Sequence, residues 1–248
     1  MQAVETVDQF DGKSMTLLEH LLELRTRLIW CALALIAGVV ISSIFTNQLM
    51  HFLLDPAKKQ APELELIFTA PMENVATYFK VALLGGLILA MPMFIYQTLM
   101  FVLPALTPAE KKWVIPLVIG MLLSFLAGVA FSFYIILPPS ANVLFNFNSD
   151  IALPNIKVGS YFDFVTRLLF WVGLTFEMPI FILAMARFGM ITGRQLLGWW
   201  RFAIVGAFVL SAIITPTIDP VTQTLVAGPI IVLWLIGTGL AFIFGRPR

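Results

Sequence analysis

The sequence predicts an all-α polytopic membrane protein with six transmembrane helices and both termini in the cytoplasm. Of its 248 residues, 60% are hydrophobic and only 12% are charged, whereas a soluble domain carries about 25% charged residues. Six apolar runs are separated by short polar connections, and a helix needs about 20 mostly apolar residues to cross the bilayer. Lysine and arginine are abundant in alternate connections and scarce in the others.

Before the first run, residues 1–14 are polar and acidic, and we expect them to form a disordered cytoplasmic tail. Thr16 and Glu19 have the spacing of a capping box, which predicts a helix start. One apolar stripe at helical spacing follows, made of Leu17, Leu21, Leu24 and Leu28. We therefore expect an amphipathic helix at the membrane surface that leads into the first span. Residues 15–248 are predicted to be a single six-span membrane domain.

The six predicted spans are 28–45, 75–97, 113–137, 162–186, 202–214 and 221–245. The third is expected to end before Pro138-Pro139, and the fifth is short and stops at Thr215-Pro216. The longest connection joins the first two spans, and a short helix is expected there around Asn47–Leu54. The sequence shows no internal repeat of the kind found in many secondary transporters.

The orientation follows from the distribution of basic residues in short connections. One side of the membrane carries ten of them: Lys13, Arg25, Arg27, Lys111, Lys112, Arg187, Arg194, Arg201, Arg246 and Arg248. The other side carries Lys58, Lys59 and Lys157, while Lys80 and Arg167 fall within spans. The side with ten is predicted to be cytoplasmic, and the even number of spans places both termini there.

Glu177 is the polar residue placed deepest in the predicted membrane region, in the fourth span beside Pro179. An ionisable residue at this depth should face protein or a water-filled cavity, so Glu177 is either bonded to a neighbouring helix or part of a functional site. Pro179 should kink the span. Asp163 and Arg167 are four residues apart and are expected to pair along the helix, while Lys80 is expected to extend toward the interface.

Several other acids have two open interpretations. Glu23 is four residues from Arg27, which allows an ion pair within the helix. Glu110 completes a capping box with Thr107. Asp219 precedes Pro220, as an N-cap residue does, and Gln223 lies one turn further on the same face. Each of these carboxylates can be a structural group or part of a binding site, and for Asp219 both roles can coexist.

Four segments, in order along the chain, carry a resemblance to a known family. They are His20-Leu-Leu-Glu23-Leu-Arg25-Thr-Arg27, Phe101-Val-Leu-Pro104-Ala105-Leu106 followed by Glu110, Thr175-Phe176-Glu177-Met178-Pro179, and Thr215-Pro216 through Asp219 to Gln223. Together they resemble the signature segments of the TatC family, the receptor subunits of twin-arginine protein translocases. The resemblance covers residues 15–245 and implies six helices in a concave arrangement with kinked spans.

The resemblance also implies a function and a set of site residues. TatC-like proteins bind the twin-arginine signal peptides of folded precursors in the inner membrane. They assemble with TatA- and TatB-type single-span proteins and with further copies of themselves, and the proton-motive force drives export. The implied signal-peptide-binding residues are Glu23, Glu110, Arg25, Arg27 and Phe101. Glu177 matches the family's intramembrane polar site, and Asp219 and Gln223 match its region for partner docking.

The chemistry of the two cytoplasmic acids agrees with this assignment, because two adjacent guanidinium groups can each make a planar two-bond contact with a carboxylate. The alternative is a proton-coupled secondary transporter that uses Glu177, and a membrane scaffold is a further possibility. Residues for enzymatic catalysis, for a metal site or for a cofactor are not grouped in the spans, since the two histidines, His20 and His51, lie in or near loops. The net charge of +1 gives no reason to expect nucleic-acid binding.

Overall fold

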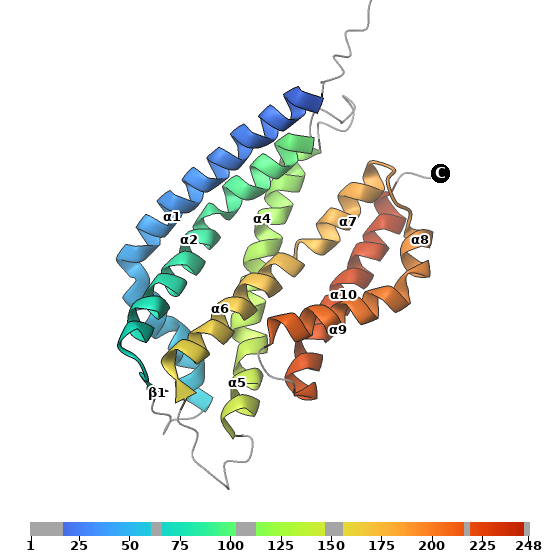
Figure 1. The fold of residues 1–248 in the computed structure, drawn as a ribbon. Helices are drawn as coiled ribbons and strands as arrows, with labels where there is room; N and C mark the ends of the chain where they lie inside the picture. Colours follow the sequence, from blue (N-terminus) through green and yellow to red (C-terminus); the bar gives the residue numbers. More distant parts are fainter. Residues whose placement is uncertain (1–16, 61–65, 103–112, 147–155, 216–218, 246–248) are drawn as a thin grey trace, which may run out of the picture.

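The computed structural model describes residues 17–60, 66–102, 113–146, 156–215 and 219–245 (Figure 1). Nearly all of these residues are helical. The helices are α1 (Leu17–Gln60), α2 (Pro71–Val102), α4 (Val114–Phe131), η2 (Ser132–Ile136), α5 (Leu137–Asn146), α6 (Val158–Thr175), α7 (Met178–Arg187), α8 (Gly193–Gly198), α9 (Trp200–Ile214) and α10 (Pro220–Phe244). The predicted tail at 1–14 and the capping residue Thr16 lie outside the described residues.

The two longest helices, α1 and α2, lie side by side (Figure 1). Small residues allow their backbones to approach closely, because a Cβ atom on Gly38 would lie only 2.4 Å from the carbonyl oxygen of Gly86. The 44 residues of α1 form one continuous helix. The expected helix at Asn47–Leu54 is present, but it is not a short element of its own, because this segment continues α1. The predicted surface helix likewise runs without a break into the first span.

The third predicted span does not end at Pro138-Pro139. A short π-helical segment, η2, follows α4, and the chain then continues as α5 through both prolines to Asn146. Proline lacks the N–H group that closes a helical turn. A π-helical segment has a wider hydrogen-bonding pattern, and here it lies directly before the position where the two N–H groups are lost. This explains why a helix continues where the sequence predicted an end.

The fourth predicted span is interrupted as Pro179 indicated. Helix α6 ends at Thr175, two residues form a turn, and α7 begins at Met178 with Pro179 in its first turn. The N–H of Phe181 bonds to the carbonyl oxygen of Glu177 at 3.0 Å. The hydroxyl group of Ser124 on α4 donates to the free carbonyl oxygen of Phe176 at 2.5 Å. Glu177 therefore occupies a helix start inside the protein.

At the other end of the molecule, α10 packs against both α7 and α9 (Figure 1). Asp219 is the N-cap of α10, since its side chain accepts a hydrogen bond from the N–H of Thr222 at 2.6 Å. The short helix α8 was not predicted. Its signal is present in the sequence, because Thr192 and Gln195 form a reciprocal capping box.

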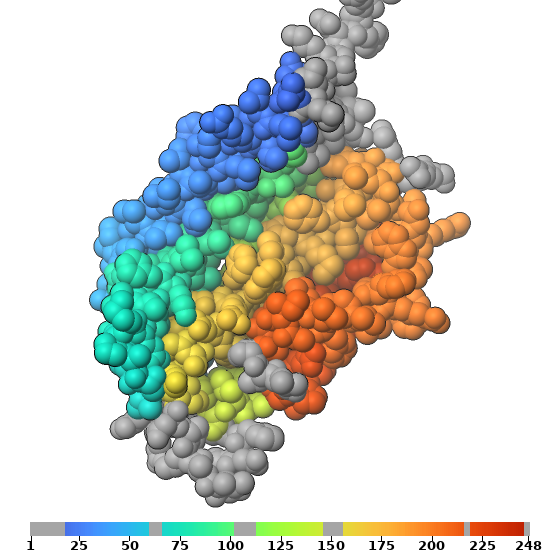
Figure 2. Space-filling model, viewed as in Figure 1, coloured from blue at the N-terminus to red at the C-terminus, as the bar shows by residue number. Residues whose placement is uncertain are grey.

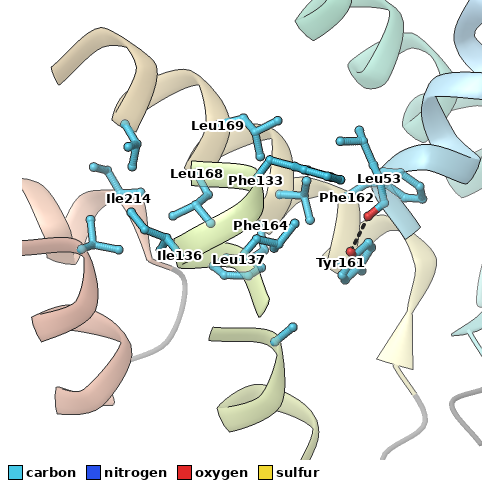
Figure 3. Packing of buried hydrophobic residues seen from close by; sticks show 14 of the residues in the cluster. Leu53, Phe133, Ile136, Leu137, Tyr161, Phe162, Phe164, Leu168, Leu169 and Ile214 are labelled. Carbon is cyan, nitrogen blue, oxygen red and sulfur yellow. Dashed lines mark hydrogen bonds between the residues drawn. The ribbon is translucent and has the colours of Figure 1, made fainter. Parts of the chain in front are cut away.

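The largest buried cluster joins α1, α2, η2, α5, α6, α9 and α10 (Figure 3). Within it, the fully buried Tyr161 of α6 donates a hydrogen bond from its hydroxyl group to the carbonyl oxygen of Leu53 on α1, at 2.6 Å. This bond satisfies a polar group that would otherwise be costly to bury. The contact fixes the start of α6 against the second half of α1.

Among the described residues, five helical segments are long and apolar enough to cross a membrane, and α9 is a shorter apolar helix. Large hydrophobic side chains are exposed along most of these helices, and Figure 2 shows one face of this exterior, coloured by residue number. A soluble protein rarely exposes so much contiguous apolar surface. The chain is therefore a helical membrane protein, and each of the six predicted spans lies at least mainly within one or two of these helices.

Candidate functional site

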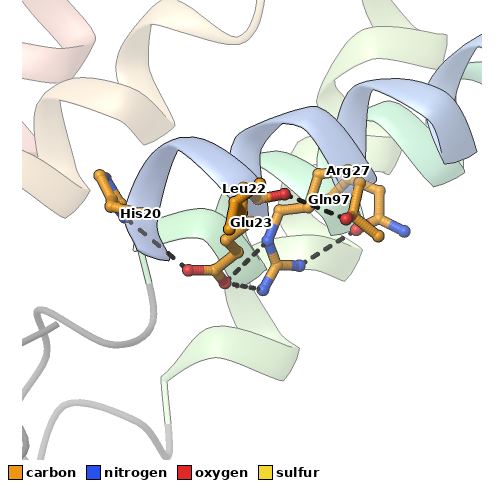
Figure 4. A network of polar contacts seen from close by, with 6 residues as sticks. His20, Leu22, Glu23, Arg27 and Gln97 are labelled. Carbon is orange, nitrogen blue, oxygen red and sulfur yellow. Dashed lines mark hydrogen bonds and ion pairs between the residues drawn. The ribbon is translucent and has the colours of Figure 1, made fainter. Parts of the chain in front are cut away.

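Glu23 lies in a polar network at the N-terminal end of α1 (Figure 4). Arg27, one turn further along α1, donates from Nε to Glu23 Oε1 at 3.0 Å, and its Nη2 contacts the same oxygen. The remaining nitrogen, Nη1, donates to Oε1 of Gln97 on α2 at 3.1 Å. The predicted ion pair between Glu23 and Arg27 is therefore present. It is also linked to the neighbouring helix, which the sequence analysis did not predict.

Phe101, at the C-terminal end of α2, lies beside this network. The ring of His20 stacks on the ring of Phe101, with centroids 4.3 Å apart, and His20 Nδ1 is 3.7 Å from Glu23 Oε2. This second carboxylate oxygen is buried and has no hydrogen-bond partner among the described residues. The site therefore combines a carboxylate oxygen bonded to Arg27, a second carboxylate oxygen buried without a hydrogen bond, and a pair of stacked rings.

Of the two remaining predicted signal-binding residues, the structure describes Arg25 only. Arg25 is exposed on α1, on the turn between Glu23 and Arg27. Glu110 lies outside the described residues. Gln97 was missed by the sequence analysis. The sequence indicates this residue only as a polar side chain at the end of a mainly apolar span.

Glu177 lies in the wall of a cavity between α2, α4, α6 and α7, with a volume of about 240 Å³. Its side chain is 2% exposed. Neither of its carboxylate oxygens has a hydrogen-bond partner in the described parts of the chain. The other lining residues are almost entirely apolar: Leu87, Met91, Phe94, Ile95, Thr98, Met121, Phe170, Leu174 and Phe181. Glu177 is therefore the main polar group of an apolar cavity at the helix break.

The predicted pair of Asp163 with Arg167 is wrong. Asp163 Oδ1 lies 2.6 Å from Nζ of Lys80, on the neighbouring helix α2. Lys80, which is expected to extend toward the interface, is thus one partner of an ion pair between helices. Arg167 forms no hydrogen bond or ion pair with any described residue, and its side chain is exposed. An interhelical contact has replaced the local one because α2 and α6 pack together.

Asp219 and Gln223, the predicted docking residues, both make internal contacts. Asp219 caps α10, as described above, so its structural interpretation is confirmed. The side-chain amide of Gln223 donates to the carbonyl oxygen of Phe208 on α9 at 3.2 Å, and the Ser211 hydroxyl group donates to the Gln223 carbonyl oxygen at 2.6 Å. Gln223 therefore connects the start of α10 to α9 at a partly exposed position.

Comparison with known proteins gives one consistent family. The family model described as Sec-independent protein translocase protein (TatC) matches residues 19–229. The chloroplastic Sec-independent protein translocase protein TATC of Arabidopsis thaliana is 38% identical over 236 residues, which are 95% of this chain and 69% of that protein. The TatC protein of Aquifex aeolicus is 37% identical over 236 residues, which cover 94% of this chain and 98% of that protein.

Two solved structures have the same fold. One is a crystal structure of the twin-arginine translocase receptor TatC, with a TM-score of 0.82, 38% identity, and coverage of 90% of this chain and 98% of that chain. The other is the same receptor in the detergent DDM, with a TM-score of 0.84, 37% identity, and coverage of 92% and 100%.

Proposed function

From the premise that this chain belongs to the TatC family and is the receptor component of a Sec-independent protein translocase, we propose that Glu23 and Glu110 form its site for twin-arginine signal peptides. Arg25, Arg27 and Phe101 complete the site. The chain is a receptor subunit, not an enzyme. It works with other components of the translocase.

The observation that carries the proposal is the state of the Glu23 carboxylate. Its Oε1 already accepts from a guanidinium group, that of Arg27, so the local environment accommodates this type of cation. Its Oε2 is buried without a hydrogen-bond partner among the described residues, and leaving such an acceptor unpaired is unfavourable. An arginine of the signal peptide would satisfy Oε2 and at the same time stack on the neighbouring rings of His20 and Phe101.

Glu110 supplies the second carboxylate in this proposal. It lies in the segment that joins α2 to α4, and Phe101 is at the end of α2. The first arginine of the signal would bind Glu23 and the second Glu110. Since each charge-assisted hydrogen bond contributes about 1.5–3 kcal/mol, two such contacts would distinguish arginine from lysine, which lacks the planar fork.

The remaining assignments extend the proposal into the membrane. The apolar segment of the signal would lie along the cavity of Glu177, which offers apolar walls with one polar group. TatA- and TatB-type single-span proteins would dock at the partly exposed start of α10, near Asp219 and Gln223. Further copies of this chain would join the assembled complex, and the proton-motive force would drive export. The complex would reside in the bacterial inner membrane.

The distribution of lysine and arginine supports cytoplasmic termini, because the connections carrying most of these residues face the cytoplasm in membrane proteins. This orientation places the Glu23 network and the segment that contains Glu110 on the cytoplasmic side. The signal-binding site would then face the cytoplasm, from which a precursor would arrive. Labelling of single cysteines near either terminus in sealed vesicles would test it.

The test of the signal site is a binding measurement with two peptides, one with the twin arginines and one with two lysines in their place. We expect Glu23→Gln and Glu110→Gln each to weaken binding of the arginine peptide about tenfold or more and to change binding of the lysine peptide much less. Glu19→Gln is the matched control, since it removes an exposed acid one turn earlier on α1. Equal losses for both peptides would contradict the assigned site and leave the family unchanged.

A further inference from the structure

A second cavity lies between α2 and α6, about 260 Å³ in volume. Its lining combines two basic residues with apolar walls: Lys80, Arg167, Leu83, Leu84, Phe170 and Trp171. It shares Leu87 and Phe170 with the cavity of Glu177, so the two cavities are neighbours along the same pair of helices. We call it the basic groove.

The charges in the basic groove do not balance. Lys80 is paired with Asp163 at 2.6 Å, whereas Arg167 has no hydrogen bond or ion pair within the described residues. The three side chains therefore leave one positive charge uncompensated. A guanidinium group at membrane depth is costly unless it meets an anion or water, and an anion that carries one negative charge would balance this one.

The depth of these residues indicates where the anion comes from. Lys80 is nine positions beyond Pro71, the first residue of α2, and Arg167 is nine positions beyond Val158, the first residue of α6. Each is five positions beyond the start of its predicted span, at residues 75 and 162, which is about 8 Å at 1.5 Å per residue and in the outer half of a hydrocarbon core about 30 Å thick. Under the orientation proposed above, this is the periplasmic half of the membrane.

We propose that the basic groove binds one anionic phospholipid of the periplasmic leaflet. Its phosphate group would accept hydrogen bonds from Arg167, with Lys80 at the edge of the site, and one acyl chain would lie against Leu83, Leu87 and Phe170. Basic pockets between transmembrane helices recognise anionic headgroups in this way, and guanidinium is the side-chain group best suited to a phosphate.

The charge complementarity favours a lipid over a polypeptide. A phospholipid supplies one phosphate charge and an apolar chain in a single molecule. A polypeptide segment would need an acidic side chain at the same depth, which is rare in membrane-spanning sequences.

Lipid retention by the purified full chain in detergent tests the proposal, with native mass spectrometry as the readout. We expect one phosphatidylglycerol to remain bound to the parent protein, and phosphatidylcholine to be retained several-fold less. Arg167→Gln should reduce phosphatidylglycerol retention about tenfold, consistent with the loss of a charge-assisted contact. Lys157→Gln is the matched control, because it removes one exposed positive charge at the start of α6 outside the groove.

Asp163→Asn is expected to increase lipid binding, a result that misfolding of the variant would not produce. This change removes the carboxylate that is paired with Lys80 beside the groove, so Lys80 becomes free to contact the phosphate and phosphatidylglycerol should bind several-fold more tightly. Equal retention by Arg167→Gln and the parent protein would overturn the proposal, as would equal retention of the two lipids. A photo-crosslinking residue at Leu83 should capture lipid in native membranes, and capture of a polypeptide there instead would also overturn it.

Discussion

Gly38 of α1 and Gly86 of α2 are in direct backbone contact. A Cβ atom on Gly38 would lie 2.4 Å from the Gly86 carbonyl oxygen, and one on Gly86 would lie 2.5 Å from the backbone nitrogen of Val39. The same antiparallel pair of helices brings Arg27 next to Gln97. The close crossing thus sets the relative position of the two helices that carry the Glu23 network.

The first prediction concerns this crossing. Gly86→Val should lower the stability of the protein by at least about 1–3 kcal/mol, the usual cost of overpacking, because backbone atoms cannot move aside as a side chain can. Thermal unfolding in detergent measures the effect. Gly239→Ala is the matched control, since a Cβ at Gly239 would meet no atom within 4 Å. A Gly86→Val protein as stable as the control would show that the crossing is looser than described.

The second prediction concerns Gln97, which anchors Arg27 across the helix pair. Gln97→Leu should weaken binding of a twin-arginine peptide several-fold, because Arg27 loses a charge-assisted hydrogen bond worth about 1.5–3 kcal/mol and holds the Glu23 carboxylate less firmly. Gln97→Glu retains an acceptor at the same place and should retain most of the affinity. Peptide titration measures both variants. Unchanged affinity in Gln97→Leu would mean that Gln97 does not position the network.

The sequence predicted those features that local patterns determine. Hydrophobic runs identified the helices that hold the six spans, Pro179 indicated the break between α6 and α7, and Asp219 followed by Pro220 indicated the cap of α10. Each of these depends on residues within one or two turns of each other. The Glu23–Arg27 pair was predicted for the same reason.

The features that were not predicted depend on distant residues or on an unusual local hydrogen-bonding pattern. Asp163 pairs with Lys80 instead of Arg167 because α2 and α6 are neighbours in space, and Gln97 reaches Arg27 across a similar contact. The helix continues through Pro138-Pro139 after a π-helical segment, and no residue pattern in the sequence predicts such a segment.

The third prediction separates the two roles of Asp219. Asp219→Ala should reduce stability by about 1 kcal/mol, the usual cost of losing an N-cap, whereas Asp219→Asn keeps an acceptor for the Thr222 N–H and should be nearly neutral. Thermal unfolding measures the cap. Crosslinking to single-span partner proteins measures docking, and a loss of crosslinking in the stable Asp219→Asn variant would indicate that the charge itself contributes to docking.

The last prediction concerns the thickness of the membrane around α9. Its 15 residues span about 22 Å, less than a hydrocarbon core of about 30 Å. A short span is accommodated by local thinning of the bilayer, which would lower the barrier to passage of a folded protein nearby. We expect spin labels at the exposed positions Val205, Val209 and Ile213 to report a narrower apolar layer, from their accessibility to oxygen and to a polar relaxing agent. Labels along α10, at Val232, Ile236 and Ile243, provide the reference because that helix has 25 residues. The same apolar depth along both helices would show that α9 does not thin the bilayer.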